Sequence, residues 1–336
     1  MDDLAEWVIG PQSVPEMRLV TAKSFFIDRI EPQCEDVILP ARELPTGKIR
    51  LKEGQVRLEP KKRRRLATIL PKITKRVPEG RWAFDMRLED PENWAHFLND
   101  HLPLFFHVAH GTERDPKTAL LLLPSDVPEY IPRVARVFGL ECWATDAPVV
   151  GEGVDVAVTP YISNRTDRHE WARLQYPQAI MDRLISEPAS VELPEKVFLT
   201  RTKQRGPSNN SEVEAFLKTR GFQTVLPESL PPEDQFRLFL KAKEIVAITG
   251  AGLAPLLYTL PPERGPTRLI EVLPCFHMST VYREMAHLVG LHYVGVRGRI
   301  RPEYVELAYD FDKSLQVFDE DSFHVDIASL ERALSL

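Results

Sequence analysis

The second half of the chain alternates short apolar runs with amphipathic segments, and this alternation constrains the fold more than any other feature of the sequence. Strands are predicted at 197–200, 223–226, 245–248, 268–273 and 292–296, and helices at 211–220, 232–242 and 280–288. Strands that alternate with helices are typical of a parallel sheet covered by helices. The sequence therefore predicts a doubly wound α/β domain, in which ligands bind beyond the carboxyl ends of the strands.

The third of these strands runs into a glycine turn, Thr249-Gly-Ala-Gly-Leu253, and a short helix is predicted at 253–260. The backbone N–H groups of such a turn, together with the start of a helix, bind anions such as a diphosphate. The alternative is that the two glycines only allow the chain to turn tightly after a strand. The turn by itself leaves both interpretations open.

Charged residues lie at the same predicted edge of the sheet. Arg201, Lys203 and Arg205 follow the first strand, and Glu271 lies near the end of the fourth. Guanidinium groups bind phosphates bidentately and offset the charge of a departing diphosphate. A carboxylate about 20 residues beyond a glycine turn is where nucleotide-binding α/β folds hold ribose hydroxyls. The competing interpretations are a solvated basic loop and a structural acid paired with a neighbouring cation.

The first half contains a helix with a histidine–aspartate pair. Asp90-Pro91-Glu92 predicts a helix start with Asp90 as N-cap, and Pro103 predicts a kink. His96 and Asp100 are four residues apart and therefore share a helix face. A carboxylate beside an imidazole can act as a general base toward an attacking hydroxyl, whereas the alternative is a solvent-facing polar patch.

The remaining pattern divides the chain into three parts. Residues 1–190 form a predicted N-terminal domain in which 1–80 are a loop-rich extension with short strands; residues 191–310 form the doubly wound domain; and residues 311–336 form a tail with a closing helix capped by Asp326. The Pro- and Glu-rich segment 187–195 is interpreted as a linker. Further elements of the first half are predicted as strands at 118–123 and 154–158, and helices at 127–140 and 168–185.

Composition excludes several classes of protein. The net charge of -6 argues against a general nucleic-acid binder. Cys34, Cys142 and Cys275 are far apart, so they predict neither a disulfide framework nor a zinc site. The absence of a signal-peptide pattern and of a run of about 18 apolar residues favours the cytoplasm.

One dense basic run, Lys61-Lys-Arg-Arg-Arg65, stands out in the loop-rich extension. Such runs are usually solvated faces. The alternative is a contact with the inner face of an anionic membrane or with a polyanionic acceptor, which would make the protein peripheral to a membrane.

Three segments together resemble glycosyltransferase family 61, which includes bacterial capsular-polysaccharide proteins and eukaryotic xylan and protein O-GlcNAc transferases. Asn93-Trp-Ala-His-Phe-Leu-Asn-Asp-His-Leu-Pro103 is similar to the family pattern N-x-x-H-W-L-x-D/E-x-L-P. The other two segments are Val197–Arg201 with Arg205, Asn210 and Glu212, and Phe222–Leu253 followed by Ile270–Pro274. The resemblance covers roughly residues 90–295.

The resemblance implies two Rossmann-like domains that face each other across a cleft, the GT-B architecture. It also implies inverting transfer from a UDP-sugar or similar donor to a glycan acceptor, by a hexosyl or pentosyl transferase with no tightly bound cofactor and no required metal. Asp100 would be the base, with His96 beside it. The donor residues would be Arg201 and Arg205 at the diphosphate, Gly250, Ala251, Gly252 and Leu253 as its cradle together with Thr249, and Glu271 at the ribose.

The sequence departs from the family pattern at three positions. Thr249 replaces a histidine, Pro255 replaces an asparagine and Phe97 replaces a tryptophan. The leading hypothesis is a glycosyltransferase of capsular-polysaccharide or other glycan synthesis. A nucleotide- or sugar-binding relative with weakened catalysis is the alternative suggested by Thr249 and Pro255. An NAD(P)-dependent oxidoreductase fits less well, because Pro255 occupies the third glycine position of the dinucleotide fingerprint.

Overall fold

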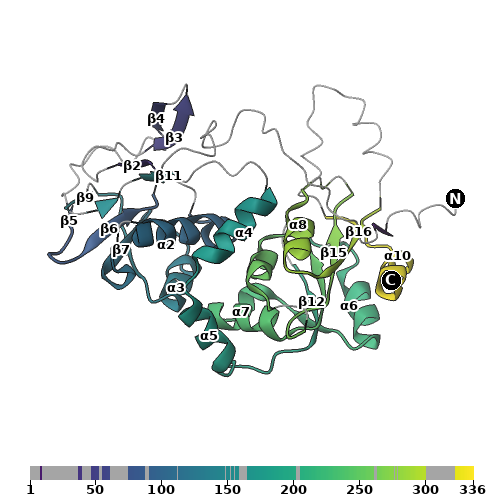
Figure 1. Ribbon diagram of the computed structural model, residues 1–336. Helices are drawn as coiled ribbons and strands as arrows, with labels where there is room; N and C mark the ends of the chain where they lie inside the picture. Colours follow the sequence, from purple (N-terminus) through teal and green to yellow (C-terminus); the bar gives the residue numbers. More distant parts are fainter. Residues whose placement is uncertain are drawn as a thin grey trace. The chain divides into compact units, whose positions relative to one another are not determined.

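The computed structural model describes residues 8–9, 37–39, 47–52, 55–60, 75–87, 91–111, 113–147, 149–151, 153–154, 156–158, 165–201, 205–260, 263–275, 277, 279–299 and 322–336. The chain forms two compact units, of which one comprises Met17–Arg183 (the N-terminal unit) and the other Met1–Glu16 with Leu184–Leu336 (the C-terminal unit). Each unit contains helices and a parallel sheet, so the predicted α/β class is confirmed (Figure 1). No helix within the described ranges has the length and apolar character needed to cross a membrane.

The C-terminal unit is built on the predicted parallel sheet. Its parallel strands are β12 (Lys196–Leu199), β13 (Gln223–Val225), β14 (Glu244–Ile248), β15 (Arg268–Leu273) and β16 (His292–Arg297). The connecting α-helices are α6 (Asn210–Thr219), α7 (Pro232–Lys241) and α8 (Val281–Leu288), and two connecting 3-10 helices are η4 (Pro227–Ser229) and η5 (Ala251–Tyr258). The strands and helices predicted for this half are therefore present, with ends that shift by one or two residues.

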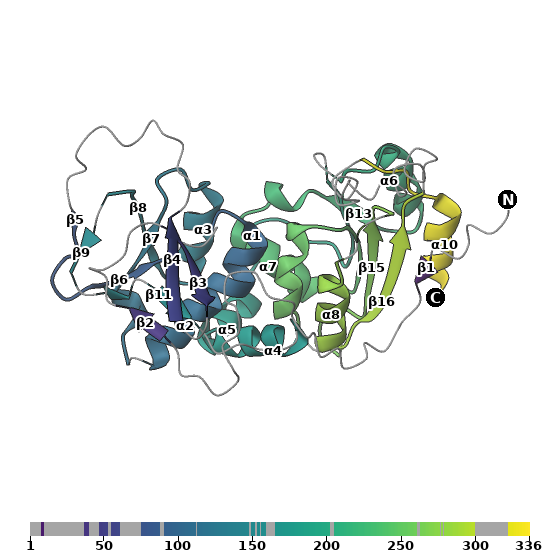
Figure 2. The same cartoon turned by 90° about the horizontal axis from the view of Figure 1, so that it is seen from above.

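The two faces of this sheet bury different side chains, because successive residues of a strand point to opposite faces. Phe198, Val246, Ile270 and Val294 pack on one face with α6 and α10 (Ile327–Ser335). Figures 1 and 2 show α6 and α10 on this side of the sheet, with α7 and α8 on the other. Glu271 follows Ile270 in β15 and therefore faces the side of the sheet that α8 covers.

Both ends of the chain contribute to this unit. β1 (Val8–Ile9) pairs antiparallel with β16 at the edge of the sheet, which the sequence pattern did not indicate. Helix α10 is the predicted closing helix. Its predicted N-cap is confirmed, since the Asp326 carboxylate accepts a 2.8 Å hydrogen bond from the Ser329 N–H.

The N-terminal unit has a smaller parallel sheet in the order β10-β6-β7-β8. These strands are β6 (Trp82–Asp85), β7 (Ala119–Leu123), β8 (Glu141–Ala144) and β10 (Gly153–Val154). The strand predicted at 118–123 is confirmed as β7. The single strand predicted at 154–158 is wrong, because β10 ends at Val154 and β11 (Val156–Val158) pairs with β2 (Val37–Leu39) in a separate sheet.

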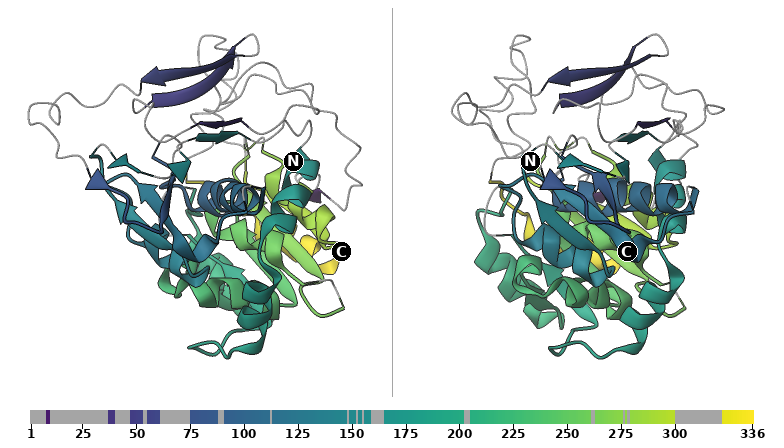
Figure 3. Two further views of the ribbon diagram at one scale, coloured as in Figure 1. Left: turned by 60° about the vertical axis from the view of Figure 1, so that its left-hand side comes forward. Right: turned by 90° about the vertical axis from the view of Figure 1, so that its left-hand side faces the viewer.

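The predicted short strands of residues 1–80 are present in the described part of that region. Besides β1 and β2, they include β3 (Gly47–Lys52) and β4 (Gln55–Pro60), which pair antiparallel and are drawn as two purple arrows in Figure 3. β5 (Lys75–Arg76) pairs with β9 (Val149–Val150). The basic run Lys61–Arg65 lies outside the described residues.

Two predicted helices differ from the observed ones, and a proline explains one of the differences. The helix predicted at 168–185 is two helices, α4 (Arg165–Gln175) and α5 (Gln178–Ser186), separated at Pro177. Proline lacks the N–H that would continue the first helix. The helix predicted at 127–140 is shorter, since α3 spans Tyr130–Val137 and Pro128 lies in the preceding turn.

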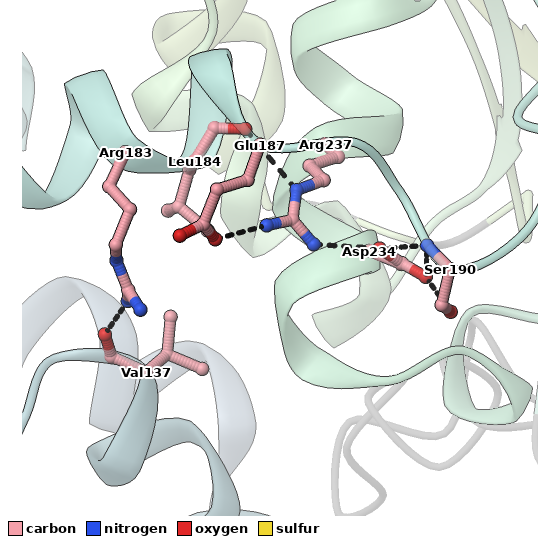
Figure 4. Close-up of polar contacts among 7 residues, drawn as sticks. All are labelled: Val137, Arg183, Leu184, Glu187, Ser190, Asp234 and Arg237. Carbon is pink, nitrogen blue, oxygen red and sulfur yellow. Dashed lines mark hydrogen bonds and ion pairs between the residues drawn. The ribbon is translucent and has the colours of Figure 1, made fainter.

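The start of the segment predicted as a linker is fixed to α7 by a group of charged side chains, which we name the Asp234 clamp (Figure 4). The Asp234 carboxylate is fully buried and accepts a 3.0 Å hydrogen bond from the Ser190 N–H. Arg237 forms 3.0 Å ion pairs with both Asp234 and Glu187, and it donates to the Leu184 carbonyl at 3.3 Å. Figure 4 also shows Arg183, which donates to the Val137 carbonyl.

Candidate functional site

The order of the strands locates a crevice in the C-terminal unit. The parallel strands lie in the order β13-β12-β14-β15-β16, so the winding of the chain reverses between β12 and β14. Ligands of open α/β sheets bind at the carboxyl ends of the strands at this point of reversal. Arg201 comes two residues after β12, and Thr249 and Gly250 follow β14 directly. The structure brings these predicted site residues together, because Arg201 Nη1 donates a 2.8 Å hydrogen bond to the Thr249 carbonyl.

Gly250 allows this close approach of the arginine. Its backbone has φ 150° and ψ -179°, a conformation that side-chain-bearing residues rarely adopt. A Cβ atom on Gly250 would lie 2.0 Å from Arg201 Nη1, so a side chain at this position would displace the guanidinium from the place it now occupies. The predicted short helix then begins at Ala251 as η5. A guanidinium beside the first backbone N–H groups of a helix forms a site suited to an anion.

The second glycine of the turn serves close packing. A Cβ atom on Gly252 would lie 3.0 Å from Pro227 Cγ, which is part of η4. Leu253 donates its N–H to the Gly250 carbonyl at 3.0 Å and is buried in the core. Gly252 therefore serves close packing and Gly250 leaves room for a charged group, whereas binding of an anion by the turn stays a prediction.

The loop after β12 is held in an unusual conformation at its second arginine. Arg205 has φ 63°, which is uncommon for a residue other than glycine and is concentrated at functional sites. The loop is anchored where α6 begins, because Thr200 Oγ1 donates to Asn210 Oδ1 at 2.9 Å. Lys203, the third predicted phosphate contact, lies outside the described residues.

Glu271 lies inside the C-terminal unit, with only 2% of its surface exposed. Its Oε2 atom accepts a 2.8 Å hydrogen bond from the Tyr293 hydroxyl, and its carboxyl group is also hydrogen-bonded to the Thr249 side chain. Burial raises the pKa of Glu271 to about 7, against the opposing effect of these two hydrogen bonds and of the charges of Arg297 and Arg283. Its predicted contact with a ribose stays a prediction.

The pKa values of two tyrosines depend on the charges around this carboxylate. Burial raises the pKa of Tyr293, and the charge of Glu271 raises it further. Burial and the charge of Glu271 also raise the pKa of Tyr282 on α8, while Arg201 and Arg205 lower it. Tyr282 is therefore within electrostatic range of Glu271 and of both arginines that follow β12.

His277 is a further buried polar residue beside the turn. Its Nε2 atom lies 3.5 Å from Thr249 Oγ1, and its carbonyl accepts a 2.7 Å hydrogen bond from Arg297. Sequence reasoning missed His277, Tyr282, Tyr293 and Arg297. For two of them the sequence offered a signal, which is their position at the carboxyl ends of strands, where ligands bind. His277 follows the end of β15, and Arg297 is the last residue of β16.

The histidine–aspartate pair is present in the N-terminal unit. His96 Nδ1 lies 2.7 Å from Asp100 Oδ2, and the side chains are 60% and 21% exposed. The predicted helix start is wrong. Helix α1 spans Trp94–His96 and is capped by Asn93, whose side chain accepts from the Ala95 N–H at 3.0 Å, so Pro91 and Glu92 precede the helix. The predicted cap, Asp90, lies outside the described residues.

The kink predicted from Pro103 takes the form of a π-helical turn. This turn, η2 (Phe97–His101), lies between α1 and α2 (Leu102–Gly111) and contains Asp100. In a π-helix the Leu98 carbonyl would accept from the residue five positions on, which is Pro103 and has no N–H. The Tyr176 hydroxyl supplies the missing donor at 2.5 Å. Such turns are frequent at functional sites.

Each unit thus has its own candidate chemistry. The C-terminal unit has a cationic, glycine-lined edge suited to an anion, and the N-terminal unit has an imidazole–carboxylate pair suited to moving a proton. In the part of the chain that the structure describes, no group of three or more histidine, cysteine, aspartate or glutamate side chains could hold a metal ion.

A comparison with models of known protein families gives a match. A protein-family model described as Glycosyltransferase 61 matches residues 94–267, which is just over half of the chain. The matched segment includes the His96–Asp100 pair, Arg201 and the glycine turn, and it ends before Glu271. A search of curated proteins found no match.

Proposed function

The chain belongs to the glycosyltransferase 61 family, and we propose that it transfers a sugar from a nucleotide-sugar donor to a hydroxyl group of a glycan. One observation carries the donor site: the Arg201 guanidinium lies over Gly250, at the point of reversal between β12 and β14. Glycosyl transfer from such a donor releases a nucleoside diphosphate. A site that offers a guanidinium and helix N–H groups together is suited to bind that anion.

The proposed donor contacts follow from this geometry. Arg201 binds the diphosphate, Arg205 and Lys203 add positive charge from the same loop, and the N–H groups of Ala251 and Gly252 bind oxygens at the start of η5. These groups stabilise the negative charge that develops on the leaving diphosphate. We propose a UDP-sugar as donor, on the family resemblance.

The proposed acceptor chemistry is a single displacement. The acceptor hydroxyl gives its proton to Asp100, whose carboxylate is held by His96, and its oxygen forms a bond to the anomeric carbon as the bond to the diphosphate breaks. Attack opposite the leaving group inverts the anomeric configuration. The same proposal includes the GT-B class, catalysis without a bound metal, and an acceptor such as a capsular or other surface polysaccharide.

A transfer assay tests the proposal directly. UDP-, GDP- and CMP-sugars are offered with glycan acceptors, with and without EDTA, and the anomeric configuration of the product is read by NMR. We expect an inverted product, no loss with EDTA, and severe loss of turnover in Arg201→Ala and in Asp100→Asn. The controls are Arg220→Ala and Asp182→Asn, exposed residues of the same types. Unchanged turnover in both site variants would remove the site assignment.

A second candidate is a nucleotide-binding protein without turnover. The observation that favours it is that the Thr249 side chain is fully buried and hydrogen-bonds Glu271, so it offers no donor at the surface of the turn. Calorimetry would separate the two candidates. Nucleotide binding without transfer to any acceptor supports the second, and transfer at a measurable rate excludes it.

A further inference from the structure

A carboxylic acid with neutral partners lies beneath the glycine turn. We name Glu271, Thr249, Tyr293 and Tyr282 the Glu271 cluster. Both hydrogen-bond partners of the Glu271 carboxyl group are hydroxyls, from Tyr293 at 2.8 Å and from Thr249. Gly295, which pairs with Glu271 in the sheet, leaves room for this contact, because a Cβ atom there would lie 3.2 Å from the Tyr293 hydroxyl oxygen.

Hydroxyl partners allow the acid to change its charge without rearrangement. A hydroxyl donates to a carboxylate oxygen, and it accepts from the O–H of the protonated acid. The hydrogen-bond pattern therefore persists in either protonation state. The pKa of Glu271, raised by burial to about 7, is in the range where both states are populated near neutral pH.

Thr249 connects this acid to the proposed donor site. Its side chain is hydrogen-bonded to the Glu271 carboxyl group, and its carbonyl accepts a 2.8 Å hydrogen bond from Arg201. The next residue along the chain is Gly250. Glu271 is therefore linked to Arg201 and Gly250 through the single buried residue Thr249, and charges interact strongly in a buried environment.

Other charged and titratable groups face the cluster from each neighbouring element. They are Tyr293 and Arg297 on β16, Tyr282 and Arg283 on α8, His277 after β15, and Arg201 and Arg205 after β12. The arginines favour the ionised acid, and a bound diphosphate would neutralise part of their effect. It would also add negative charge of its own, which repels an ionised carboxylate.

We propose that Glu271 is a positioning residue of the donor site and that binding of a nucleotide sugar draws a proton from solvent onto its carboxylate wherever that carboxylate is ionised. This inference rests on the proposed function, because it takes the glycine turn as the diphosphate site. Binding converts the carboxylate and a solvent proton into the neutral acid, and departure of the nucleotide returns the proton. By linkage, donor affinity must fall as the pH rises through the titration of Glu271.

Calorimetry measures the proton directly. UDP-glucose and GDP-mannose are suitable probes, because their diphosphates are diesters and do not titrate near neutral pH. Binding is measured near pH 7 in buffers with different enthalpies of ionisation. We expect uptake of a substantial fraction of a proton per site in the wild type and none in Glu271→Gln. Donor affinity of that variant should be independent of pH, and at about pH 8.5 it should exceed the wild-type affinity by about tenfold.

The matched control is Glu244→Gln, at the opposite end of β14, where the carboxylate is paired with Lys196 and Arg268. It should retain the wild-type proton uptake. An infrared difference spectrum of the wild type, with and without UDP-glucose, checks the result independently of any variant, since a protonated carboxyl band should appear on binding.

The outcomes separate the two proposals. Donor binding without proton uptake, or with equal uptake in Glu271→Gln, overturns this inference and leaves the donor site intact. If neither probe binds the wild-type protein, the proposed donor site and this inference both fail.

Discussion

The Asp234 clamp and the Glu271 cluster place two carboxylates in the same unit with almost identical burial, at 0% and 2% exposure. Their partners differ. Asp234 is paired with the Arg237 guanidinium at 3.0 Å and accepts from a backbone N–H, whereas Glu271 is bonded by the hydroxyls of Tyr293 and Thr249. A buried carboxylate costs free energy unless it is paired, and an ionic partner fixes its charge.

The difference indicates which buried acid holds the fold and which can respond to a ligand. Asp234 forms an ion pair with Arg237 and fastens Ser190 to α7 (Figure 4). Glu271 lies under the glycine turn and titrates near pH 7, so its charge is available to change. The extent of burial does not distinguish the structural acid from the responsive one. The chemistry of the hydrogen-bonding partners distinguishes them.

Removing the carboxylate of the clamp should have the largest effect on stability. Asp234→Ala leaves Arg237 and the Ser190 N–H without this partner, so the free energy of unfolding should fall by about 3–5 kcal/mol. Urea unfolding measures it. Glu187→Ala removes the more exposed partner of the same arginine and should cost about 1 kcal/mol or less. Equal losses in the two variants would contradict a dominant role for Asp234.

Glu271→Gln should change how stability depends on pH. Because the pKa of Glu271 rises from about 4.5 to about 7 on folding, the folded state binds more protons than the unfolded state between these values. The stabilisation is complete below about pH 4.5 and is lost as the pH rises to about 7. The wild type should lose on the order of 3 kcal/mol over this window relative to Glu271→Gln. Parallel stability curves for the two proteins would show that Glu271 does not titrate there.

Gly250→Ala should weaken the donor site through Arg201. The new Cβ atom would displace the guanidinium and strain the backbone, at a cost of about 1–3 kcal/mol. Donor affinity should fall about tenfold or more, as measured by calorimetry. Gly221→Ala is the matched control, because Gly221 also has a positive φ but the nearest atom to its Cβ position is 3.9 Å away, on Lys196. This control should lose stability only.

Tyr293→Phe should have the smallest effect on the protein, because it removes only one hydroxyl of the Glu271 cluster. Its effect should be seen in the pH dependence of donor affinity. The Tyr293 hydrogen bond lowers the pKa of Glu271, so its removal raises that pKa and moves the pH midpoint of donor affinity upward by about one pH unit. Thr249→Val removes the other hydroxyl and should shift the midpoint in the same direction. If the pH midpoint of donor affinity is the same in both variants as in the wild type, the Glu271 cluster does not control donor binding.

Most of the C-terminal unit could be predicted from the sequence because its elements are clearly punctuated. Gly221, Pro231 and the glycine turn mark where helices and strands end. The pairing of β1 with β16 could not be predicted, since two residues carry no recognisable pattern and their partner is far along the chain. The split of 154–158 into β10 and β11 has the same cause, because pairing partners outside the run decide where each strand ends.

The candidate site was predictable to the extent that parallel strands end at one edge. That rule placed Arg201 beside the glycine turn, and the 2.8 Å hydrogen bond to Thr249 confirms their proximity. The rule says nothing about the Glu271 cluster. In the sequence Tyr293 reads as a core aromatic at the start of a strand, and only the sheet register and the space over Gly295 direct its hydroxyl to Glu271.

The pairing of β1 with β16 has a consequence for how the protein is made. A ribosome releases Val8 and Ile9 before the whole of the N-terminal unit, whereas their partner strand β16 leaves it only after that unit. The sheet that carries the glycine turn therefore takes its edge strand from residues synthesised before the N-terminal unit, and it closes only after that unit and β16 have emerged. A fragment that starts at Leu184 would lack this strand and expose an edge of β16 that can pair with other chains.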